Sequence, residues 1–560
     1  MQSIFNIAEI CARKEVKDCI LSPGSRCAPL TVAFVRHPGI NTLTISDERS
    51  AAFIGIGIAQ QTKRTVVLVC TSGSAAYNYA PAVAEAFYQQ IPLLLLTADR
   101  PPEWIGQQDG QTIQQNNIYG SHVKASYTLP TDYNHPDAIW HCERILSEAI
   151  NTSQQEPKGP VHINVPLREP LYKEAEGEIT FGQEVKTINI AKTKTELTEE
   201  SWQQLKTELN KTERILILAG QQNYNPDYLP LVHSIVNESG IPVVAGILSN
   251  LNEENEVIRS ADGILLSIKP EEAELLKPEL LITFGNSILS KPLKNFIRKN
   301  KPKQHWHIQE NRTIADSFQS LTTILSISPV YFLQKLKEIK KDKKYFNFWQ
   351  QKERKAREKF TSFINSTLPF NEFQAIATTL KQLPDNSILH LANSMSVRYA
   401  DYIGLPGEKK IEVFANRGTS GIDGVISTAY GAALATDKLV TVITGDMAFF
   451  YDRNAFWNNY TTKNLRIIVI NNHGGGIFRV IDGPSKLPEL DDYFETKQAL
   501  TAKHLATEYG LDYYPCSNTE ELDRNLKQFF LPSTKPVILE VETDSRTNTT
   551  IFNEFKNLMK

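Results

Sequence analysis

The chain contains few cysteines, and their arrangement excludes the usual cysteine-based sites. Its 560 residues include six of them, without a single Cys-x-x-Cys pair: Cys11, Cys19, Cys27, Cys70, Cys142 and Cys516. Scattered cysteines are typical of free thiols in a reducing compartment, and they argue against a zinc site or a disulfide framework. The chain also lacks any uninterrupted run of about 18 apolar residues, so we expect no membrane-spanning helix.

Neither sign of charge is in excess. Lys and Arg total 60 against 63 Asp and Glu, which gives a formal net charge of −3. Such a chain has no general attraction for nucleic acid or an acidic membrane, so we expect no nucleic-acid partner and a locally built site for any anion. The N-terminal segment MQSIFNIAEICARK lacks the basic segment and apolar run of a signal peptide. We therefore predict a cytoplasmic protein.

The length of the chain is too great for one hydrophobic core and suggests about three or four domains. Short apolar strands such as TVVLVC, RILILA and LRIIVI alternate with helical patterns throughout. Continuous apolar runs indicate strands covered on both faces, hence parallel sheets flanked by helices. A polar stretch from about Lys173 to Ser201 is typical of a linker. We predict an α/β protein of three doubly wound parallel-sheet domains: residues 1–180, 181–345 and 346–560.

Residues 335–358, KLKEIKKDKKYFNFWQQKERKARE, form a basic tract with a helical pattern. We interpret it as a solvated connecting helix rather than a nucleic-acid contact, because charge runs usually lie on solvated faces.

The strongest chemical signal lies at two strand ends in the last third of the chain. One apolar strand ends in Gly445-Asp446, and Asn472 follows the next strand 26 residues later, just before a triple glycine. A helix and a return strand fit this interval, so we expect the two strand ends to lie side by side. A carboxylate, an amide oxygen and a backbone carbonyl from the turn at Gly474 are ligands suited to Mg²⁺. Gly474 and Gly475 let the backbone approach a diphosphate closely. The pattern predicts a metal and diphosphate site.

A second charged cluster, Asp47-Glu48-Arg49, precedes the apolar helical stretch SAAFIGIGIA. Acidic residues in a first helical turn suit the helix dipole, so the cluster is consistent with a simple helix start. Charged side chains are rarely buried unless they are paired or needed, so a functional carboxylate is the alternative. Gly55-Ile56-Gly57 lacks the third glycine of a dinucleotide turn, and we interpret it as helix packing.

The Gly-Asp and Asn-Asn pairs at this spacing resemble the binding signature of thiamin-diphosphate-dependent enzymes. The resemblance implies three α/β domains of that family's type. One holds the cofactor diphosphate through Mg²⁺, with Mn²⁺ possible, and another presents a glutamate to the aminopyrimidine ring. Glu48 matches that glutamate, and would hydrogen-bond the pyrimidine nitrogen N1′. An apolar pocket would raise the pKa of its carboxyl, which suits sharing a proton. Asp47 can still start the helix.

Finer motifs are similar to those of one branch of these enzymes, the MenD family in menaquinone biosynthesis. Its members are synthases of 2-succinyl-5-enolpyruvyl-6-hydroxy-3-cyclohexene-1-carboxylate (SEPHCHC). The motifs include LSPGSRCAPL, LLLLTADRPPE, ANRGTSGIDGVISTAYGAA and TGDMAFFYDRNAF, and they span the chain except for the middle domain, which matches more loosely. The resemblance implies decarboxylation of 2-oxoglutarate and 1,4-addition of the resulting succinyl carbanion to isochorismate. It also implies a homodimer or homotetramer with active sites at subunit interfaces.

Two dicarboxylates passing through one site require several cations, and Arg is the best suited because of its forked guanidinium. The resemblance assigns Arg398 and Arg417 to the succinyl carboxylate. It assigns Ser25, Arg26 and Lys291 to isochorismate, with Arg100 in support. The remaining implied roles are a hydrogen bond from Ser394, a contact of Gln111 with the reacting centre, support of the bent cofactor by Ile422, an apolar wall from Ile477 and Phe478, and a backbone contact from Met447, which replaces the glycine of the usual Gly-Asp-Gly triplet.

Two other functions remain open at this point. Another thiamin-diphosphate carboligase or decarboxylase, acting on pyruvate-like 2-oxoacids, would share the cofactor residues but would not need so many cations. A catalytically silent protein of the same fold is the other possibility, and the presence of Glu48, Asp446 and Asn472 argues against it.

Overall fold

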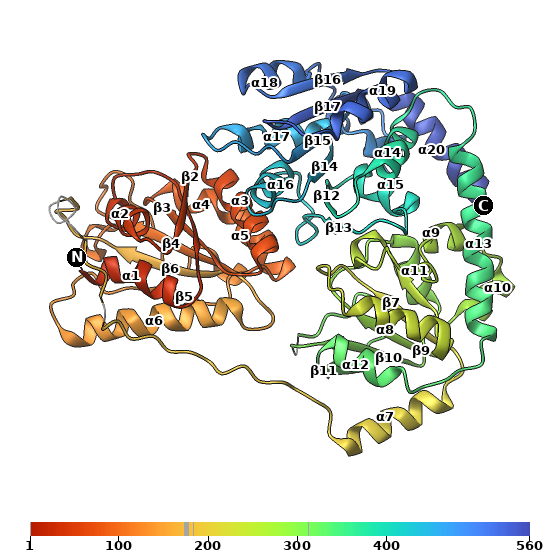
Figure 1. Cartoon of the computed structure of the whole chain (residues 1–560), viewed down its shortest axis with the longest axis horizontal. Coiled ribbons are helices and arrows are strands. Elements are labelled where there is room, and N and C mark those ends of the chain that lie inside the picture. Colours follow the sequence, from red (N-terminus) through yellow and green to blue (C-terminus); the bar gives the residue numbers. More distant parts are fainter. Residues whose placement is uncertain (1, 173–178, 183, 312) are drawn as a thin grey trace. The chain divides into compact units, whose positions relative to one another are not determined.

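The computed structural model describes residues 2–172, 179–182, 184–311 and 313–560, and it contains three parallel β-sheets (Figure 1). The predicted α/β class with three parallel sheets is therefore confirmed. The chain divides into two compact units. The first consists of Met1–Lys192, Asn416–Asp437 and Ala448–Leu465, and the second of Thr193–Ala415, Lys438–Met447 and Arg466–Lys560. The three domain boundaries stay a prediction, and residues 173–178 and 183 of the expected linker lie outside the described residues.

The first unit contains a six-stranded parallel sheet in the order β2-β1-β3-β4-β6-β5. Its strands are β1 (Asp18–Leu21), β2 (Asn41–Thr44), β3 (Val66–Cys70), β4 (Leu93–Asp99), β5 (Ser126–Thr128) and β6 (Val161–Pro166). Its helices are α1 (Gln2–Arg13), α2 (Ala28–Arg36), α3 (Glu48–Thr62), α4 (Ser74–Asn78), α5 (Ala80–Gln89), α6 (Pro136–Gln154) and α16 (Val425–Leu434).

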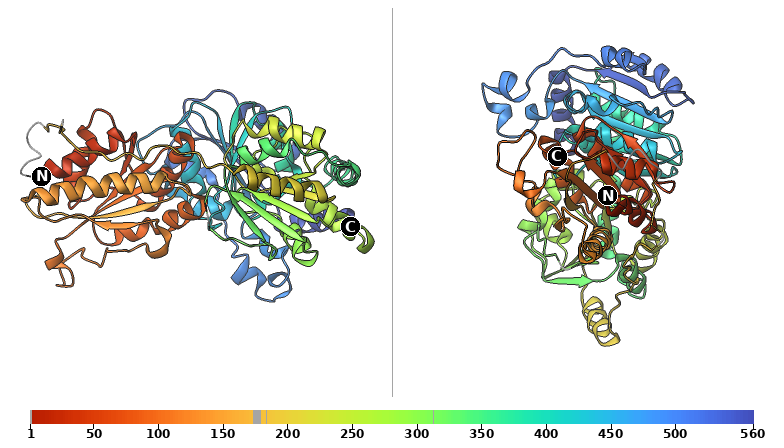
Figure 2. Two further views of the ribbon diagram at one scale, coloured as in Figure 1. Left: turned by 90° about the horizontal axis from the view of Figure 1, so that it is seen from below. Right: turned by 90° about the vertical axis from the view of Figure 1, so that its left-hand side faces the viewer.

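Both faces of this sheet are covered, which explains why its strands are apolar without alternation. Val67 and Val69 of β3 belong to a buried cluster with side chains of α1, α2 and α6. Leu68 points to the opposite face, where its side chain lies against Gly55 of α3. Figure 2 shows α6 running alongside the sheet.

Helices α3 and α16 pack against each other through glycine, as the sequence predicted for the Gly-Ile-Gly motif. A Cβ atom on Gly57 would lie 2.0 Å from the carbonyl oxygen of Thr428, and one on Gly431 would lie 2.1 Å from that of Ile54. No side chain fits at these distances, so glycine is required for the close approach of the two backbones.

We expect Gly57→Ala to lower the free energy of unfolding by about 1–3 kcal/mol, because the added methyl forces the two helices apart. Thermal or denaturant unfolding of the purified variant measures the effect. Gly110→Ala is the matched control, because a Cβ atom there would have no atom within 4 Å. Equal stability of the two variants would contradict the packing.

The second unit contains two sheets. The five-stranded sheet has the order β11-β10-β9-β7-β8, with β7 (Ile215–Ala219), β8 (Val243–Ala245), β9 (Leu280–Phe284), β10 (Gln304–Gln309) and β11 (Thr323–Ser326). The helices that belong to this part of the chain are α7 (Glu199–Lys211), α8 (Tyr228–Ser234), α9 (Ala261–Ser267), α10 (Pro270–Leu276), α11 (Lys291–Lys299) and α12 (Pro329–Leu336).

The six-stranded sheet has the order β13-β12-β14-β15-β17-β16. Its strands are β12 (Ser387–Leu391), β13 (Ile411–Phe414), β14 (Val440–Gly445), β15 (Leu465–Asn471), β16 (Asp512–Cys516) and β17 (Val537–Glu542). The helices of this region are α13 (Lys344–Ile364), α14 (Glu372–Gln382), α15 (Met395–Ile403), α17 (Asp446–Tyr451), α18 (Ala502–Glu508), α19 (Thr519–Phe529) and α20 (Ser545–Met559). One buried apolar cluster includes strands of both sheets, such as β7 and β12.

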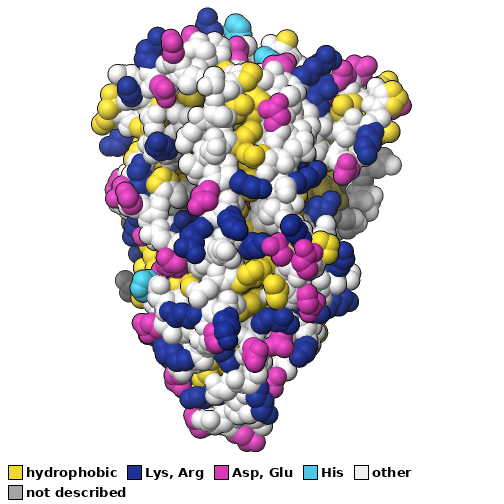
Figure 3. All heavy atoms as spheres, turned by 90° about the vertical axis from the view of Figure 1, so that its right-hand side faces the viewer, with side chains coloured by type: hydrophobic (Ala, Val, Ile, Leu, Met, Phe, Trp, Pro, Cys, Tyr) yellow, Lys and Arg dark blue, Asp and Glu magenta, His cyan; other side chains and the backbone are white. Residues whose placement is uncertain are grey.

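The basic tract 335–358 was expected to be one solvated helix, and this prediction is wrong. Helix α12 ends at Leu336 and α13 begins only at Lys344. Between them Ile339 is buried and the backbone N–H of Lys341 donates to the carbonyl of Ser239, so tertiary contacts interrupt the helix. Helix α13 also buries aromatic residues, among them Trp349. On the molecular face drawn in Figure 3, cationic and anionic side chains are interspersed.

All six cysteines are free, as predicted, and all six are buried. Among the described residues, no helix has both the length and the hydrophobicity needed to cross a lipid bilayer.

Candidate active site

Glu48 is the first residue of α3 in the first unit, and its side chain is half-buried. The preceding Asp47 is the N-cap, since its carboxylate accepts from the backbone N–H of Ser50 at 3.1 Å. The other oxygen of Asp47 accepts from the Asn454 amide at 2.7 Å. Burial raises the pKa of the Glu48 carboxyl above its ordinary value, and the adjacent charge of Asp47 adds to the effect. Asp47 therefore starts the helix, as expected, and the raised pKa of Glu48 favours the protonated form of its carboxyl.

Three of the predicted substrate residues follow strand ends in the first unit. Ser25 and Arg26 come after β1, and Arg100 directly follows β4. One Arg26 Nη donates to the carbonyl of Leu167 at 3.0 Å, at the end of β6, and the other contacts Glu169. The Arg26 Nε atom is buried and has no hydrogen-bond partner within the described part of the chain. These contacts hold the Arg26 guanidinium at the carboxyl edge of the sheet, with the Nε–H donor still available.

Arg100 and Ser25 are also held by neighbouring side chains. Arg100 is largely buried, with its guanidinium hydrogen-bonded to the Ser72 hydroxyl and 3.4 Å from an Asp109 oxygen. The Ser25 hydroxyl lies 2.9 Å from the Tyr172 hydroxyl. Gln111 is exposed, and its backbone φ of +57° lies in the left-handed region.

The segment that carries Arg417 and Ile422 is fixed by a carboxylate that sequence reasoning did not single out. Glu85 of α5 is 1% exposed and accepts hydrogen bonds from the backbone N–H groups of Gly418, at 2.7 Å, and Thr419, at 2.6 Å. The Thr419 hydroxyl also donates to it. Ile422 itself is exposed. An acidic residue in the otherwise apolar stretch APAVAEAFY was the only sequence signal for Glu85.

We expect Glu85→Gln to lower the free energy of unfolding by about 1–3 kcal/mol, because its amide NH₂ would face an N–H donor. Hydrogen exchange at Gly418 or Thr419 should become faster, since a glutamine has one acceptor oxygen and one of these two N–H groups loses its partner. Exchange measured by mass spectrometry on peptides covering residues 416–422 tests this. An exposed acid of the same unit, Glu103→Gln, is the control, and unchanged protection in Glu85→Gln would refute the anchoring role.

In the second unit, Asp446 and Asn472 lie at one edge of the six-stranded sheet, as their spacing predicts. Strands β14 and β15 are neighbours, and the two residues follow their carboxyl ends. Asp446 is buried, which raises the pKa of its carboxyl to about 6. The Gln498 amide, at 2.7 Å, and the backbone N–H groups of Met447 and Gly474 partly oppose this rise. The Gly474 turn and Asp446 thus meet at one point.

Asn472 is oriented by a second carboxylate that the sequence did not reveal. Its amide nitrogen donates to Glu372 Oε2 at 3.1 Å, and its amide oxygen is buried without a hydrogen-bond partner among the residues that the structure describes. Glu372 is buried in turn, which raises the pKa of its carboxyl, and its Oε1 accepts from the Tyr399 hydroxyl at 2.8 Å. Glu372 and Asn472 are 100 residues apart in the sequence, so no local sequence pattern indicated their contact.

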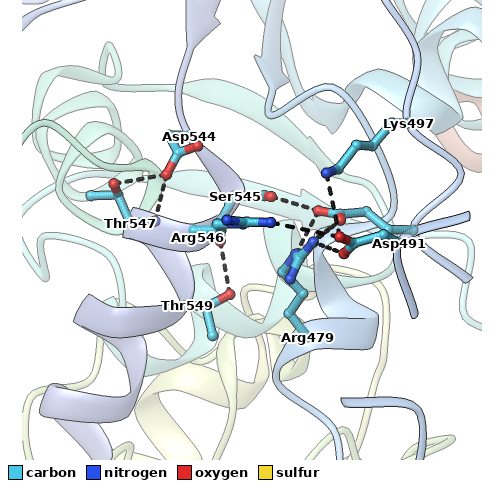
Figure 4. A network of polar contacts seen from close by, with 9 residues as sticks. Arg479, Asp491, Lys497, Asp544, Ser545, Arg546, Thr547 and Thr549 are labelled. Atoms are coloured by element: carbon cyan, nitrogen blue, oxygen red, sulfur yellow. Dashed lines mark hydrogen bonds and ion pairs between the residues drawn. The ribbon is translucent and has the colours of Figure 1, made fainter. Parts of the chain in front are cut away.

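The glycine turn lies against a following loop. The Gly475 N–H donates to the carbonyl of Glu495 at 2.7 Å, and a Cβ atom on Gly474 would lie 2.7 Å from the same oxygen. The Glu495 carboxylate is paired with Arg479, whose guanidinium also contacts Asp491. Figure 4 shows Lys497 and Arg546 directed at Asp491 from two further elements. These ion pairs hold the loop around Glu495, whose carbonyl contacts the glycine turn.

The other predicted residues of the second unit lie at helix starts or short turns. Ser394 precedes α15, with a φ of +72°, and the Arg398 guanidinium donates to its carbonyl. Burial lowers the pKa of Arg398, while the negative charge of Asp262 raises it. The Lys291 side chain is exposed at the start of α11. Ile477 and Phe478 are half-buried in the short helical turn Gly476–Arg479.

The predicted residues thus fall into two sets, each described within its own unit. The first unit holds Glu48, Ser25, Arg26, Arg100, Gln111, Arg417 and Ile422. The second holds Gly445, Asp446, Met447, Asn472, Gly474, Gly475, Ser394, Arg398, Lys291, Ile477 and Phe478. Within the described ranges, no group of three or more His, Cys, Asp or Glu side chains is placed to hold a metal ion. A site made of one carboxylate, one amide and one carbonyl does not require such a group.

Three family models of thiamine pyrophosphate enzymes match the chain, in the order of its sequence. Thiamine pyrophosphate (TPP) is another name for thiamin diphosphate. The N-terminal TPP binding domain matches residues 4–119, the middle domain 181–391 and the C-terminal TPP binding domain 399–541.

Curated relatives match over the full length of the chain. A protein of Cytophaga hutchinsonii is 49% identical over 561 residues, which cover 100% of this chain and 99% of that protein. Proteins of Flavobacterium psychrophilum and Christiangramia forsetii are 40% and 36% identical, with 99% of this chain and 98% of each relative covered. All three carry the name 2-succinyl-5-enolpyruvyl-6-hydroxy-3-cyclohexene-1-carboxylate synthase.

Proposed function

Because the chain belongs to the thiamine pyrophosphate enzymes, and within them to the 2-succinyl-5-enolpyruvyl-6-hydroxy-3-cyclohexene-1-carboxylate synthases, we propose that it catalyses the reaction that name describes. It decarboxylates 2-oxoglutarate and joins the remaining four-carbon unit to isochorismate by 1,4-addition, as a carbon–carbon bond-forming transferase of menaquinone biosynthesis. The observation that carries this assignment is the 49% identity over the whole chain.

The residues of the second unit fit a divalent cation and a diphosphate. The Asn472 amide oxygen is buried without a described partner, Asp446 is a buried carboxylate, and the Gly474 turn meets it. We propose that Asp446, Asn472 and the Gly474 carbonyl hold Mg²⁺, or Mn²⁺ in its place. Gly445, Met447 and Gly475 would offer backbone groups to the diphosphate.

Thiamin diphosphate supplies the capacity to stabilise a carbanion, and the protein supplies position and electrostatics. In our proposal Glu48 holds a proton at the pyrimidine nitrogen, for which a raised pKa suits its carboxyl. Ile422 would support the bound cofactor.

The proposed substrate contacts use the cations described above. Arg398 and Arg417 bind the carboxylate that remains on the four-carbon unit, and their forked guanidinium groups suit a bidentate contact. Isochorismate would contact Ser25, Arg26, Arg100 and Lys291. The other proposed contacts are a hydrogen bond from Ser394, an approach of Gln111 to the reacting centre, and an apolar wall from Ile477 and Phe478.

We also propose a homodimer or homotetramer with active sites shared between subunits, in the cytoplasm. The six free cysteines support a reducing compartment. Shared sites are supported by the sequence positions of Glu48 and Asp446, which belong to separate TPP binding domains.

The donor-substrate preference tests the assignment against the alternative of a pyruvate-type enzyme. With thiamin diphosphate and Mg²⁺ present, CO₂ release is measured from 2-oxoglutarate and from pyruvate, with isochorismate as acceptor. 2-Oxoglutarate has a second carboxylate that pyruvate lacks, and the proposed arginines would bind it. We therefore expect a higher kcat/KM for 2-oxoglutarate than for pyruvate. Preference for pyruvate would overturn the assigned reaction and favour the alternative.

A further inference from the structure

Glu372 is a buried carboxylate whose hydrogen-bond partners are uncharged side chains. It is 5% exposed at the start of α14, and its two oxygens accept from the Tyr399 hydroxyl at 2.8 Å and the Asn472 amide at 3.1 Å. Its backbone N–H donates to the Asn548 side chain at 3.0 Å. The described residues provide no ion pair for this carboxylate. Burying a carboxyl group without an ion pair is costly, and its hydrogen bonds offset only part of that cost.

The chemistry of Glu372 decides which way the Asn472 amide faces. Both Glu372 oxygens accept hydrogen bonds, Oε1 from Tyr399 and Oε2 from the NH₂ group of Asn472. The amide oxygen then points away from Glu372, where it is buried and finds no hydrogen-bond partner in the described chain. A buried acceptor left unsatisfied is costly, and a bound cation would satisfy it.

We propose that Glu372 is a positioning residue, which fixes the Asn472 amide so that its oxygen faces the divalent cation. Tyr399 holds Glu372 in place through the hydrogen bond to Oε1. This inference rests on the proposed function, specifically on the cation site at Asp446 and Asn472.

Both oxygens of Glu372 accept hydrogen bonds, which a glutamine with its single oxygen cannot reproduce. A glutamine at position 372 could donate to the Asn472 oxygen as well as accept from its nitrogen. The Asn472 amide could then flip, and its oxygen would accept a hydrogen bond from the glutamine instead of facing the metal. Loss of a group that orients a metal ligand typically costs about 10- to 100-fold in metal affinity.

The test is a Mn²⁺ titration of the full chain at saturating thiamin diphosphate, with free Mn²⁺ counted by electron paramagnetic resonance. We expect Glu372→Gln to raise the Mn²⁺ dissociation constant by about 10- to 100-fold. Tyr399→Phe should raise it less, because the carboxylate stays. Glu353→Gln is the matched control: Glu353 is a buried acid of the same unit that binds Ser260 and Arg357, and its substitution should leave Mn²⁺ affinity unchanged.

Thermal unfolding without cofactor identifies any variant that fails to fold. An unchanged Mn²⁺ dissociation constant in folded Glu372→Gln would overturn the inference. If that variant does not fold, an unchanged constant in Tyr399→Phe would overturn it instead. Failure of the unsubstituted chain to bind Mn²⁺ with thiamin diphosphate would refute the proposed cation site, and this outcome is distinct because it requires no substitution.

Discussion

Replacing Glu48 by Gln should lower kcat for CO₂ release by about 10²- to 10⁴-fold, because a glutamine cannot exchange a proton with the pyrimidine nitrogen. The carboxyl of Glu48 is half-buried at the start of α3, and burial raises its pKa in the direction that proton sharing requires. The diphosphate and cation residues lie in another part of the sequence. We therefore expect the rise in melting temperature caused by thiamin diphosphate and Mg²⁺ to persist in Glu48→Gln.

The adjacent acid provides the control. Asp47 caps α3 through the Ser50 N–H, and asparagine is about as good an N-cap as aspartate. Asp47→Asn should therefore keep most of its activity. Equal activity of Glu48→Gln and the unsubstituted chain would remove Glu48 from the mechanism.

Replacing Asp446 by Ala should abolish the stabilisation of the protein by thiamin diphosphate and Mg²⁺, and with it the activity. A ligand that binds only the native state raises the melting temperature in proportion to the logarithm of its concentration over its dissociation constant. Asp446 is the one carboxylate proposed to bind the cation, so its loss should move that dissociation constant beyond the concentrations used. Differential scanning fluorimetry over a range of Mg²⁺ concentrations measures the effect.

Asp482→Ala is the control, because Asp482 is fully exposed in the same unit. That variant should respond to the cofactor as the unsubstituted chain does. A normal cofactor response in Asp446→Ala would contradict the proposed cation site.

The two inactive variants also test whether sites are shared between subunits. In a mixed dimer, one site would combine the intact Glu48 and Asp446 of different chains. Mixing Glu48→Gln and Asp446→Ala chains should therefore restore part of the activity. No recovery in mixed dimers proven by differential tagging would contradict shared sites.

Much of the fold could be predicted because a strand that is buried on both faces of its sheet has a continuous apolar sequence. Strand β3, VVLVC, is buried at every position, and its continuous apolar run indicated a parallel sheet. The same reasoning placed Asp446 and Asn472 at neighbouring strand ends, since 26 residues accommodate one return to the sheet. These predictions succeed because they depend on local pattern and on a general rule of sheet topology.

The supporting residues could not be predicted, because their partners are distant in sequence. Glu85 anchors the backbone at Thr419, Glu372 contacts Asn472, and Gln498 reaches back to Asp446. Each is a polar residue in an ordinary helix or loop, and only the folded chain brings it to the site. The basic tract was mistaken for one helix for a similar reason, since the contact of Lys341 with Ser239 that interrupts it is tertiary.

The product formed from two substrates tests the central claim most directly. The purified chain with thiamin diphosphate and Mg²⁺ is given 2-oxoglutarate with and without isochorismate, and the products are analysed by mass spectrometry. We predict CO₂ release that depends on isochorismate, and a new product with the mass of isochorismate plus 2-oxoglutarate minus CO₂. Release of CO₂ from 2-oxoglutarate with isochorismate left unchanged would contradict the synthase assignment.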